Sequence, residues 1–342
     1  MFKILGAGIS GLTSAINLAK NGEDVIVYEK RPKVGMKMKP NFQLFGNWDT
    51  SDDIIDHLKS FGVDINYQTK LDRIIFYSPN LKHTAQLYSS SRPVGYTVIR
   101  GGKNSLECYL AKQAKKLGVK IITNFNKRIK ADIIAAGSKR LDGVGYGSIF
   151  KGRFDKKTAI VLFDYNYAPG GYAYILPHSK RIATVAIAMR PWDNPQNMFQ
   201  KLISEHKIFK EHLVNSKLLY NFSGFINFSI PNTAIEGNSL LVGEAAGFQD
   251  AAFGFGMRYA IYSGYLASKS ILERKNYDEL WKKAFLHELK KTLKIRYVLE
   301  KIGNNFLNRL IKNIGERDIE EFTNIWNSER RLALFFIKSL FY

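Results

Sequence analysis

Three glycines and one acid near the start of the chain have the types and the spacing of a nucleotide-binding turn. Gly6, Gly8 and Gly11 follow a short apolar run, and Glu29 ends a second apolar run beyond a helical stretch. Gly6 permits a tight turn, Gly8 lets a pyrophosphate approach the backbone, and Gly11 lets a helix pack closely on a strand. Glu29 is placed to accept hydrogen bonds from a ribose, and the basic pair at 30–31 leads toward an adenosine. The pattern predicts a dinucleotide whose phosphates lie on free N–H groups of a helix N-terminus.

A second group of small residues and one acid lies far downstream. Gly243 and Glu244 end an apolar strand, and Gly254 and Gly256 open an apolar helix at Met257. An acid at a strand end can hydrogen-bond a polyol, while N–H groups at the later helix can face the edge of a flavin ring. A fold that binds only NAD needs no such element, so this group indicates FAD. The alternative is a helix that packs through small residues.

Two further glycine-containing stretches carry weaker signals. The buried run 131–136 ends at Ala136 and Gly137, which fits passage beneath a flavin dinucleotide and equally an ordinary strand end. Residues 143–147 alternate glycine with other types, but they follow no clear strand and open no helix. They predict a turn and not a second nucleotide site.

The pattern of hydrophobic and polar residues predicts the helices and strands that must position these residues. Residues 1–30 read as a βαβ unit, while 67–78, 84–90 and several runs within 158–228 read as strands of an antiparallel sheet. We expect an α/β chain (α+β overall) in which a Rossmann-like FAD-binding domain is interleaved with a β-sheet substrate domain, followed by a C-terminal helical segment. The expected division is 1–66, 96–157 and 232–275 for the FAD-binding domain, 67–95 and 158–231 for the substrate domain, and 276–342 for the helical segment.

Composition sets outer limits. The chain has 342 residues, 45% of them hydrophobic, which suits a globular protein of two interleaved domains. The single cysteine, Cys108, provides no disulfide framework and no thiolate metal cluster, so we expect no metal and a reducing cytoplasm. The chain begins with a strand, which leaves no room for a signal peptide, and no apolar run is long enough to span a bilayer.

The chain is strongly basic, with a formal net charge of +21. Residues 100–157 alone hold 15 Lys and Arg against four Asp and Glu. The charge fits an ordinary solvated surface, and it also fits attraction to an anionic membrane surface or to a phosphate-bearing substrate. We expect no nucleic-acid partner, because no known nucleic-acid module accompanies the charge.

A third motif, PGGYAYILP at 169–177, lies on the expected substrate sheet. With the two cofactor signatures, it makes the chain resemble the FAD-dependent geranylgeranyl reductase family, which includes the archaeal digeranylgeranylglycerophospholipid reductases, within the flavoproteins of the aromatic-hydroxylase fold. The family pattern on the substrate side is P-x-x-Y-x-W-x-F-P. The matching or equivalent positions in this sequence are Pro169, Tyr172, Tyr174 (for Trp), Leu176 (for Phe) and Pro177. Both replacements keep the bulky apolar surface that an isoprenoid tunnel requires.

The resemblance covers roughly the first 275 residues and implies roles for individual residues. It also shows two departures. Glu244 stands where the family has an Asp, which lengthens the acid and shifts or weakens its contact with the ribityl chain. Residues 36–40 replace a Gly and Cys loop, which puts a cysteine-assisted step in doubt and brings lysines to this edge. The residues expected at the cofactor are Gly6, Gly8, Gly11, Glu29, Lys30, Arg31, Arg100, Ala136, Gly137, Gly243, Glu244, Gly254, Gly256 and Met257.

The activity that the resemblance implies is saturation of C=C bonds in geranylgeranyl chains of membrane lipids or their precursors. Reduced flavin would supply a hydride and a proton would reach the other carbon. Tyr172, Tyr174 and His178 are weak candidates for the proton donor, since each also reads as a wall residue, and water or reduced flavin are alternatives. The electron donor is open between NAD(P)H, a ferredoxin and another small reductant.

Two other functions fit the same fold. One is a flavin monooxygenase, although its Asp-Gly motif for NADPH contact is not apparent here. The other is a non-catalytic protein that binds flavin and isoprenoid lipid, which the departures at Glu244 and 36–40 motivate.

The C-terminal segment adds an apolar helical face and an apolar end. Trp281, Phe285, Leu289 and Leu293 recur at four-residue spacing and predict one buried face. The end at 332–342 is too short to span a membrane, and it can lie on one or dock on the body of the protein. We therefore expect a cytoplasmic protein with peripheral membrane contact as an open alternative.

Overall fold

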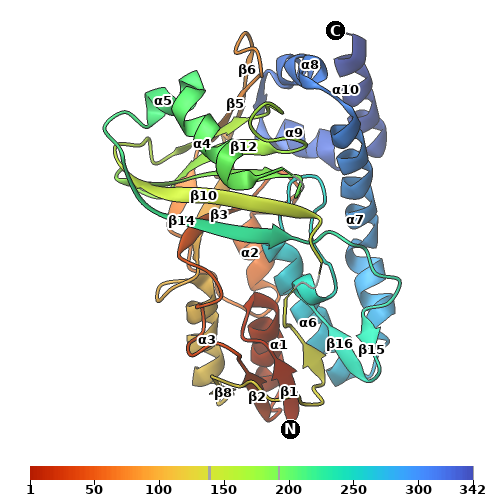
Figure 1. Cartoon of the computed structure of the whole chain (residues 1–342). Helices are drawn as coiled ribbons and strands as arrows, with labels where there is room; N and C mark the ends of the chain where they lie inside the picture. The colour runs from red at the N-terminus through yellow and green to blue at the C-terminus, as the bar shows by residue number, and fades with distance from the viewer. Residues whose placement is uncertain (138–139, 192, 342) are drawn as a thin grey trace.

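The computed structural model describes residues 1–137, 140–191 and 193–341, and of residues 340 and 341 it describes only the backbone. Tyr342, which belongs to the predicted apolar end, lies outside these residues. The described chain forms two sheet-centred layers, one above the other in Figure 1, with the C-terminal helices along one side.

A six-stranded sheet holds the first glycine turn. Neighbouring strands are parallel except at the β15–β16 edge. This arrangement confirms the predicted Rossmann-like unit. The strands in spatial order are β15 (Ile235–Glu236), β16 (Ser239–Leu241), β9 (Ile133–Ile134), β1 (Phe2–Leu5), β2 (Val25–Tyr28) and β8 (Lys120–Ile122).

Helix α1 (Ile9–Lys20) connects β1 to β2 and is buried between α3 (Leu106–Lys116) and α6 (Met257–Glu273). Its closest neighbour is α6, because Gly264 removes the side chain that would lie 2.4 Å from the carbonyl oxygen of Ser10. The hydroxyl of Ser14 donates to the carbonyl of Gly264 at 2.9 Å across the same contact. This packing brings the start of the chain beside the residues of the second glycine group.

An eight-stranded sheet forms the upper layer. It is antiparallel except for the parallel pairs β5–β11 and β6–β17, so the predicted β-sheet layer is present. The strands in spatial order are β14 (Lys217–Ile226), β10 (Gly143–Lys151), β13 (Ile182–Met189), β12 (Tyr172–Pro177), β11 (Thr158–Leu162), β5 (Arg73–Tyr77), β6 (Thr84–Tyr88) and β17 (Glu316–Asp318).

The turn predicted at 143–147 is wrong, because these residues begin strand β10. Their glycines recur at every second position and therefore share one face of the strand. A side chain at Gly147 would lie 2.3 Å from the Cβ of Ala186 on β13, so glycine allows the close approach. β10 belongs to the eight-stranded sheet, whereas the predicted domain division placed it with the FAD-binding part; the division as a whole stays a prediction.

A small antiparallel sheet joins the two layers. It consists of β3 (Asn41–Gly46), β7 (Gly95–Arg100) and β4 (Thr69–Leu71). The N–H of Phe42 on β3 donates to the hydroxyl of Thr184 on β13 at 3.1 Å, which ties this sheet to the upper layer. The remaining helices are α2 (Ile54–Lys59), α4 (Pro195–Glu205), α5 (Lys207–His212), the 3₁₀ turn η1 (Gly243–Ala245), α7 (Tyr277–Lys301), α8 (Asn304–Ile314), α9 (Ile319–Trp326) and α10 (Glu329–Phe341).

The C-terminal helices dock on the body. Phe306 and Phe335 bury against Phe163 of the chain after β11, and Trp326 buries against Ala252. Leu332 and Phe335 of the apolar end thus pack on the body, whereas Leu334 and Ile337 are exposed, so contact of this exposed face with a membrane stays a prediction. On α7, Trp281, Phe285 and Leu289 are buried as predicted, but Leu293 is 39% exposed. Four residues exceed one helical turn of 3.6, so a strict four-residue pattern drifts around the helix.

Candidate functional site

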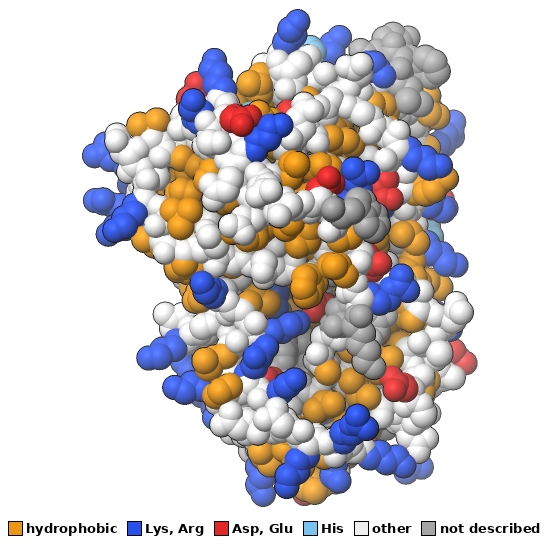
Figure 2. All heavy atoms as spheres, viewed as in Figure 1, with side chains coloured by type: hydrophobic (Ala, Val, Ile, Leu, Met, Phe, Trp, Pro, Cys, Tyr) orange, Lys and Arg blue, Asp and Glu red, His pale blue; other side chains and the backbone are white. Residues whose placement is uncertain are grey.

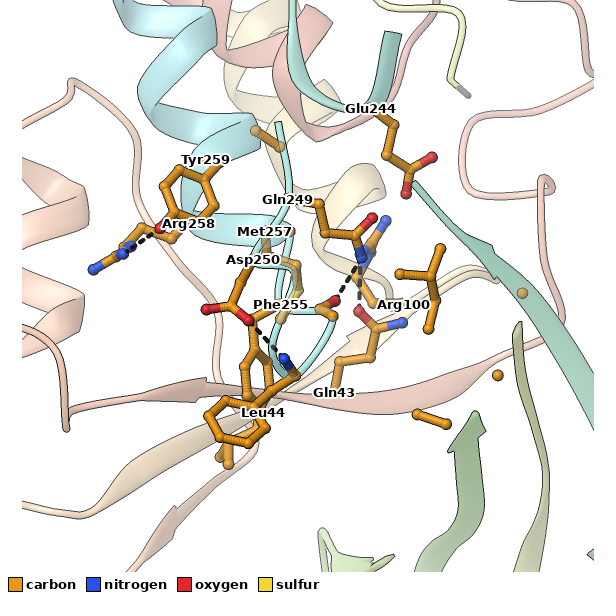
Figure 3. Close-up of a pocket in the computed structure, with 18 of the residues that line it drawn as sticks. Gln43, Leu44, Arg100, Glu244, Gln249, Asp250, Phe255, Met257, Arg258 and Tyr259 are labelled. Carbon is orange, nitrogen blue, oxygen red and sulfur yellow. Dashed lines mark hydrogen bonds between the residues drawn. The ribbon is translucent and has the colours of Figure 1, made fainter. Parts of the chain in front are cut away.

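One cavity of about 1120 Å³ lies between the two layers and the C-terminal helices, and both glycine groups line it. Figure 3 shows side chains from β3, β7 and the residues before and in α6 converging on it. Of the predicted residues, those that line the cavity are Gly6, Gly8, Glu29, Lys30, Arg31, Arg100, Ala136, Gly137, Tyr172, Tyr174, Leu176, Glu244, Gly254, Gly256 and Met257. Those outside its lining are Gly11, Pro169, Pro177, His178 and Gly243.

The first turn is shaped by three glycines with different tasks. Gly6 has φ +107°, and a side chain there would lie 2.4 Å from the carbonyl oxygen of Ala135. Gly8 has open space within 4 Å of the place where a Cβ would be, and it faces the cavity. A Cβ on Gly11 would lie 2.1 Å from the carbonyl oxygen of Gly6. Gly11 therefore holds helix and strand together, while Gly8 leaves the backbone accessible.

Two helices begin at the cavity without a side-chain cap. Helix α1 starts after Gly8 and helix α6 starts after Gly256, and neither cap residue offers a side-chain hydrogen bond. By contrast, α2, α3, α4, α7 and α9 are each capped by Asp, Ser or Asn, while α5 and α8 also lack a side-chain cap but begin outside the cavity lining. The first N–H groups of a helix have no partner within the helix, so they are left for an anion or a carbonyl. This is the arrangement that a pyrophosphate at α1 and a flavin ring edge at α6 require.

The carboxylate of Glu29 lies beside the first glycine turn, near the N-terminus of α1 where a pyrophosphate would bind. It accepts the N–H of Ala7 at 2.9 Å and the N–H of Arg31 at 2.8 Å, which fix its orientation at the cavity wall. Phe125 and Lys127, in the loop after β8, line the cavity beside Glu29, and the ring of Phe125 packs on Tyr28. This loop was not predicted from the sequence, because its residue types do not distinguish it from an ordinary connection.

The two glycine groups touch through Ser10 and Gly243. A side chain on Gly243, which has φ +59°, would lie 2.8 Å from the hydroxyl oxygen of Ser10. The N–H of Gly243 donates to the hydroxyl of Ser263 on α6 at 2.9 Å. Gly243 therefore does not face the cavity, but it sets the turn that brings Glu244 to the cavity wall.

The two departures from the family pattern meet in space. Lys37, from the altered 36–40 loop, forms an ion pair with Glu244 at 3.0 Å beside Gly137. Cys108 does not line the cavity. Its thiol is directed instead at the carbonyl oxygens of Val34 and Gly102. This cavity wall therefore presents a lysine–glutamate pair and not a thiol.

Arg100, at the end of β7, is held by two side-chain hydrogen bonds. Its Nε donates to Glu107 at 2.6 Å and its Nη1 donates to Gln43 at 3.0 Å. Burial alone would raise the pKa of Glu107, but the charge and hydrogen bond of Arg100 outweigh it and hold that pKa below its usual range. The pair is thus ionised, and the cation of Arg100 is fixed at the cavity wall (Figure 3).

The aromatic motif on β12 faces the apolar part of the cavity. The hydroxyl of Tyr172 donates to the carbonyl of Phe253 at 2.7 Å, and burial raises its pKa strongly. The hydroxyl of Tyr174 has no hydrogen-bond partner among the described residues, and burial raises its pKa to about 12. Both rings act as cavity wall. The C-terminal side chains that complete this part are Ile295, Leu299, Leu310, Ile314, Phe322, Trp326, Leu332, Phe335 and Phe336.

His178 lies away from the cavity. Its ring stacks on Phe42, and its Nε2 is buried without a hydrogen-bond partner. Burial lowers the pKa of His178 to about 3, so the ring is neutral at ordinary pH. The structure does not bring this candidate together with the other predicted residues.

A buried acidic group that was not predicted from the sequence lines the cavity between the cofactor end and the apolar part. Asp250 accepts the N–H of Phe253 at 2.7 Å, and burial raises its pKa to about 7. Beside it, Asp49 forms an ion pair with Arg258 at 2.9 Å, and Arg258 also donates to the hydroxyl of Tyr259. Asp250 lies within the second signature, but its type alone gave no sign that it would be buried.

These features fit FAD. Two uncapped helix N-termini, an oriented carboxylate at the ribose position and a fixed arginine line one continuous cavity. The fold and the site together are those of an FAD-binding protein. Residues 4–52 match the family model for an NAD(P)-binding Rossmann-like domain.

Comparisons with known proteins confirm the resemblance to geranylgeranyl reductases. The digeranylgeranylglycerophospholipid reductase of Methanospirillum hungatei is 25% identical over 178 residues, 47% of this chain and 43% of that protein. The reductase of the same name from Methanocaldococcus jannaschii is 23% identical over 397 residues, 98% of this chain and 97% of that protein. This chain spans about half the length of the M. hungatei protein and of one further relative that is 27% identical.

Solved structures share the fold. A geranylgeranyl bacteriochlorophyll reductase-like protein from Thermoplasma acidophilum has a TM-score of 0.80 at 18% identity, with coverage of 97% of this chain and 94% of that chain. The 2-methyl-3-hydroxypyridine-5-carboxylic acid oxygenase has a TM-score of 0.59 at 15% identity, with coverage of 91% and 95%. Reductases and oxygenases therefore use the same architecture.

Proposed function

We propose that this chain reduces C=C bonds in geranylgeranyl chains of membrane lipids or their precursors. The observation that carries the proposal is one continuous cavity, with a dinucleotide cradle at one end and an aromatic and aliphatic chamber at the other. A long isoprenoid offers many apolar carbons and no polar group along its length, which matches this chamber. When bound, reduced FAD supplies the hydride.

The residues of this chain have separate tasks in the proposal. Gly8 and the N-terminus of α1 bind the pyrophosphate, Glu29 the ribose, and Gly256 with α6 the edge of the ring. Tyr172, Tyr174 and the C-terminal helices hold the isoprenoid and exclude water. The electron donor is a reductant that contacts the protein transiently, either NAD(P)H, a ferredoxin or another small carrier.

The test is an anaerobic incubation of the flavin-loaded protein with a geranylgeranyl glycerophospholipid and dithionite. The expected result is products heavier by two hydrogens, or by multiples of two, in mass spectrometry. Flavin that is reduced and lipid that is bound but unchanged would contradict the proposal and favour the non-catalytic binding protein.

The second candidate is a flavin monooxygenase, which the oxygenase with the same fold motivates. It predicts oxygen consumption that rises on addition of the organic substrate, with a product heavier by one oxygen. The apolar lining of the chamber favours the reductase, because it offers few polar groups to orient an aromatic acid or phenol.

We also propose peripheral contact with an anionic membrane, since the substrate resides there and the chain is strongly basic. No helix within residues 1–137, 140–191 or 193–341 is long and apolar enough to cross a bilayer.

A further inference from the structure

A carboxyl group is buried where the cofactor cradle meets the apolar chamber. Asp250 lies between the 3₁₀ turn η1 and helix α6, and it lines the cavity. Its Oδ1 accepts the N–H of Phe253, the N–H of Ala252 lies beside the carboxyl group, and no described side chain donates to its Oδ2. Figure 3 shows the dashed bond on one oxygen and the other oxygen pointing away from it. One oxygen therefore positions the group, while the other is free to carry a proton.

The apolar chamber begins directly beside this carboxyl group. Phe253, which orients Asp250 through its N–H, accepts the hydroxyl of Tyr172 through its carbonyl oxygen. The ring of Tyr172 lies 6.2 Å from the ring of Phe253 and 5.9 Å from the ring of Phe163, measured between centroids. Asp250 is thus joined through one residue to the aromatic wall of the predicted isoprenoid site.

We propose that Asp250 is the catalytic residue that donates the proton in the reduction of the isoprenoid C=C bond. The inference rests on the proposed function and supplies the acid that the sequence did not reveal. Among the described carboxyl groups that line the cavity, Glu244, Glu107 and Asp49 each form an ion pair with Lys or Arg, and both oxygens of Glu29 accept backbone N–H groups. Asp250 forms no ion pair, and no described side chain donates to its Oδ2.

The π bond breaks, one carbon takes the proton from Oδ2 of Asp250, and the other takes a hydride with its electron pair from the reduced cofactor. Two C–H bonds form, the O–H bond of Asp250 breaks, and the carboxylate regains a proton from solvent. Protonation of a trisubstituted alkene places positive charge on the more substituted carbon, which the faces of the nearby aromatic rings stabilise.

The surroundings keep the acid protonated near neutral pH. Burial is the largest influence on its pKa of about 7, and the negative charge of Asp49 adds to it. The hydrogen bond from Phe253 is the main influence that lowers the pKa, and the charge of Arg258 and the N–H of Ala252 lower it less. The guanidinium of Arg258 is engaged by Asp49 and Tyr259. Tyr172 is neutral because burial raises its pKa. A donor must be protonated at working pH and still be acidic enough to transfer its proton, and a pKa near 7 satisfies both conditions.

The test uses Asp250→Asn in the flavin-loaded full chain. The amide oxygen of Asn can still accept the N–H of Phe253, so the loop is retained, but the group is no longer an acid. We expect bound flavin and its reduction by dithionite to stay at wild-type levels, and lipid reduction to fall roughly 10²- to 10⁴-fold. The matched control is Asp164→Asn, because Asp164 is also buried and accepts a backbone N–H but lies outside the cavity lining.

A second measurement does not depend on turnover. Infrared spectra of the protein at pH 5 should contain the carbonyl band of a protonated carboxyl group that is absent in Asp250→Asn. That band should disappear with a midpoint near pH 7, and the rate of lipid reduction should decline over the same range.

Each outcome decides one claim. A wild-type rate in Asp250→Asn, or a band that titrates with the ordinary pKa of an aspartate, overturns Asp250 as the donor and leaves the reductase intact. A wild-type protein that binds and reduces flavin but never changes the lipid overturns the proposed function, and the proton donor falls with it.

Discussion

Neighbouring glycines in the first turn should respond differently to the same substitution. Gly11→Ala places a Cβ 2.1 Å from the carbonyl oxygen of Gly6, so we expect a loss of roughly 1–3 kcal/mol in the free energy of unfolding. Gly8→Ala meets no atom within 4 Å, so the stability should stay close to wild type. Flavin affinity should nevertheless fall in Gly8→Ala, because the new methyl group occupies the approach of the pyrophosphate.

Denaturant unfolding and flavin titration of the two variants check this pair. Equal stability in both variants would contradict the packing role of Gly11. Unchanged flavin affinity in a folded Gly8→Ala protein would show that the pyrophosphate does not lie on this turn.

The stability of the protein should depend on the ionisation of Asp250. Its pKa in the folded protein is about 7 against an ordinary value of 3.8, so the folded state favours the protonated form. The stability from this preference is complete below pH 3.8 and is lost as the pH rises through 7. The total loss is about 4 kcal/mol at 1.36 kcal/mol per pKa unit.

Asp250→Asn removes this dependence. The difference in free energy of unfolding, variant minus wild type, should therefore grow by roughly 3 kcal/mol between pH 5 and pH 8 in favour of the variant. Urea denaturation at the two pH values measures it. A difference that stays constant with pH would mean that Asp250 is ionised in the folded protein throughout.

At the scale of residues, sequence predicts a site where type and spacing alone impose the chemistry. Gly6, Gly8 and Glu29 are such positions, since a turn of this kind needs these types at these intervals. Asp250 is not, because its raised pKa arises from burial by segments distant in the chain. His178 shows the opposite case: its type suggested proton transfer, and its packing on Phe42 places it outside the cavity.

At the scale of elements, the strand β10 shows how glycine misleads. Gly143, Gly145 and Gly147 predict a turn from local preference, but the contacts of β10 with β13 and β14 make it a central strand. Pairing between strands distant in the sequence overrides local preference. Gly145 also lines the cavity, and because glycine has no side chain it leaves room there for a ligand.

The C-terminal helices should control substrate size without touching the cofactor cradle. Leu310 on α8 is buried and lines the apolar chamber. Leu310→Trp fills part of the chamber, so we expect turnover of a long geranylgeranyl lipid to fall at least 10-fold while flavin affinity stays unchanged. Lys312→Trp is the control, because it adds the same side chain on the exposed side of the same helix.

Lipid reduction by mass spectrometry and flavin titration of both variants test this role. If Leu310→Trp reduces the long lipid as fast as Lys312→Trp does, the isoprenoid does not occupy the space beside α8. The sequence predicted helices here, but it left open whether they meet a membrane or the body, since an apolar face suits both.

At the scale of the whole molecule, positive charge covers much of the surface, and Figure 2 shows Lys and Arg spread over the face in view. One concentration lies at an end of the eight-stranded sheet, in a hollow of about 660 Å³ between the 153–157 and 180–181 loops. Among the residues that the structure describes, four cations there have no carboxylate partner: Arg153, Lys156, Lys180 and Arg181. Lys217 on β14 pairs with Lys151, which precedes the 153–157 loop, so this part of β14 lies close to the cations. Val214 and Leu218, on either side of Lys217 in the sequence, are exposed. Cations around exposed apolar side chains are the pattern of a surface that meets anionic lipid.

Removal of these four charges should therefore release the protein from anionic vesicles. We expect the variant with Ala at 153, 156, 180 and 181 to bind phosphatidylglycerol vesicles up to about 1000-fold more weakly at low salt, at about 1 kcal/mol per charge. A control with Ala at 112, 115, 116 and 120 removes the same number of positive charges, from exposed lysines on α3 and β8 in the lower layer of Figure 1. Vesicle co-sedimentation of both variants distinguishes a docking surface from general attraction, because net charge falls equally in the two. An equal loss of binding would assign the attraction to net charge alone, whereas tight binding by the first variant would place the membrane contact elsewhere on the protein.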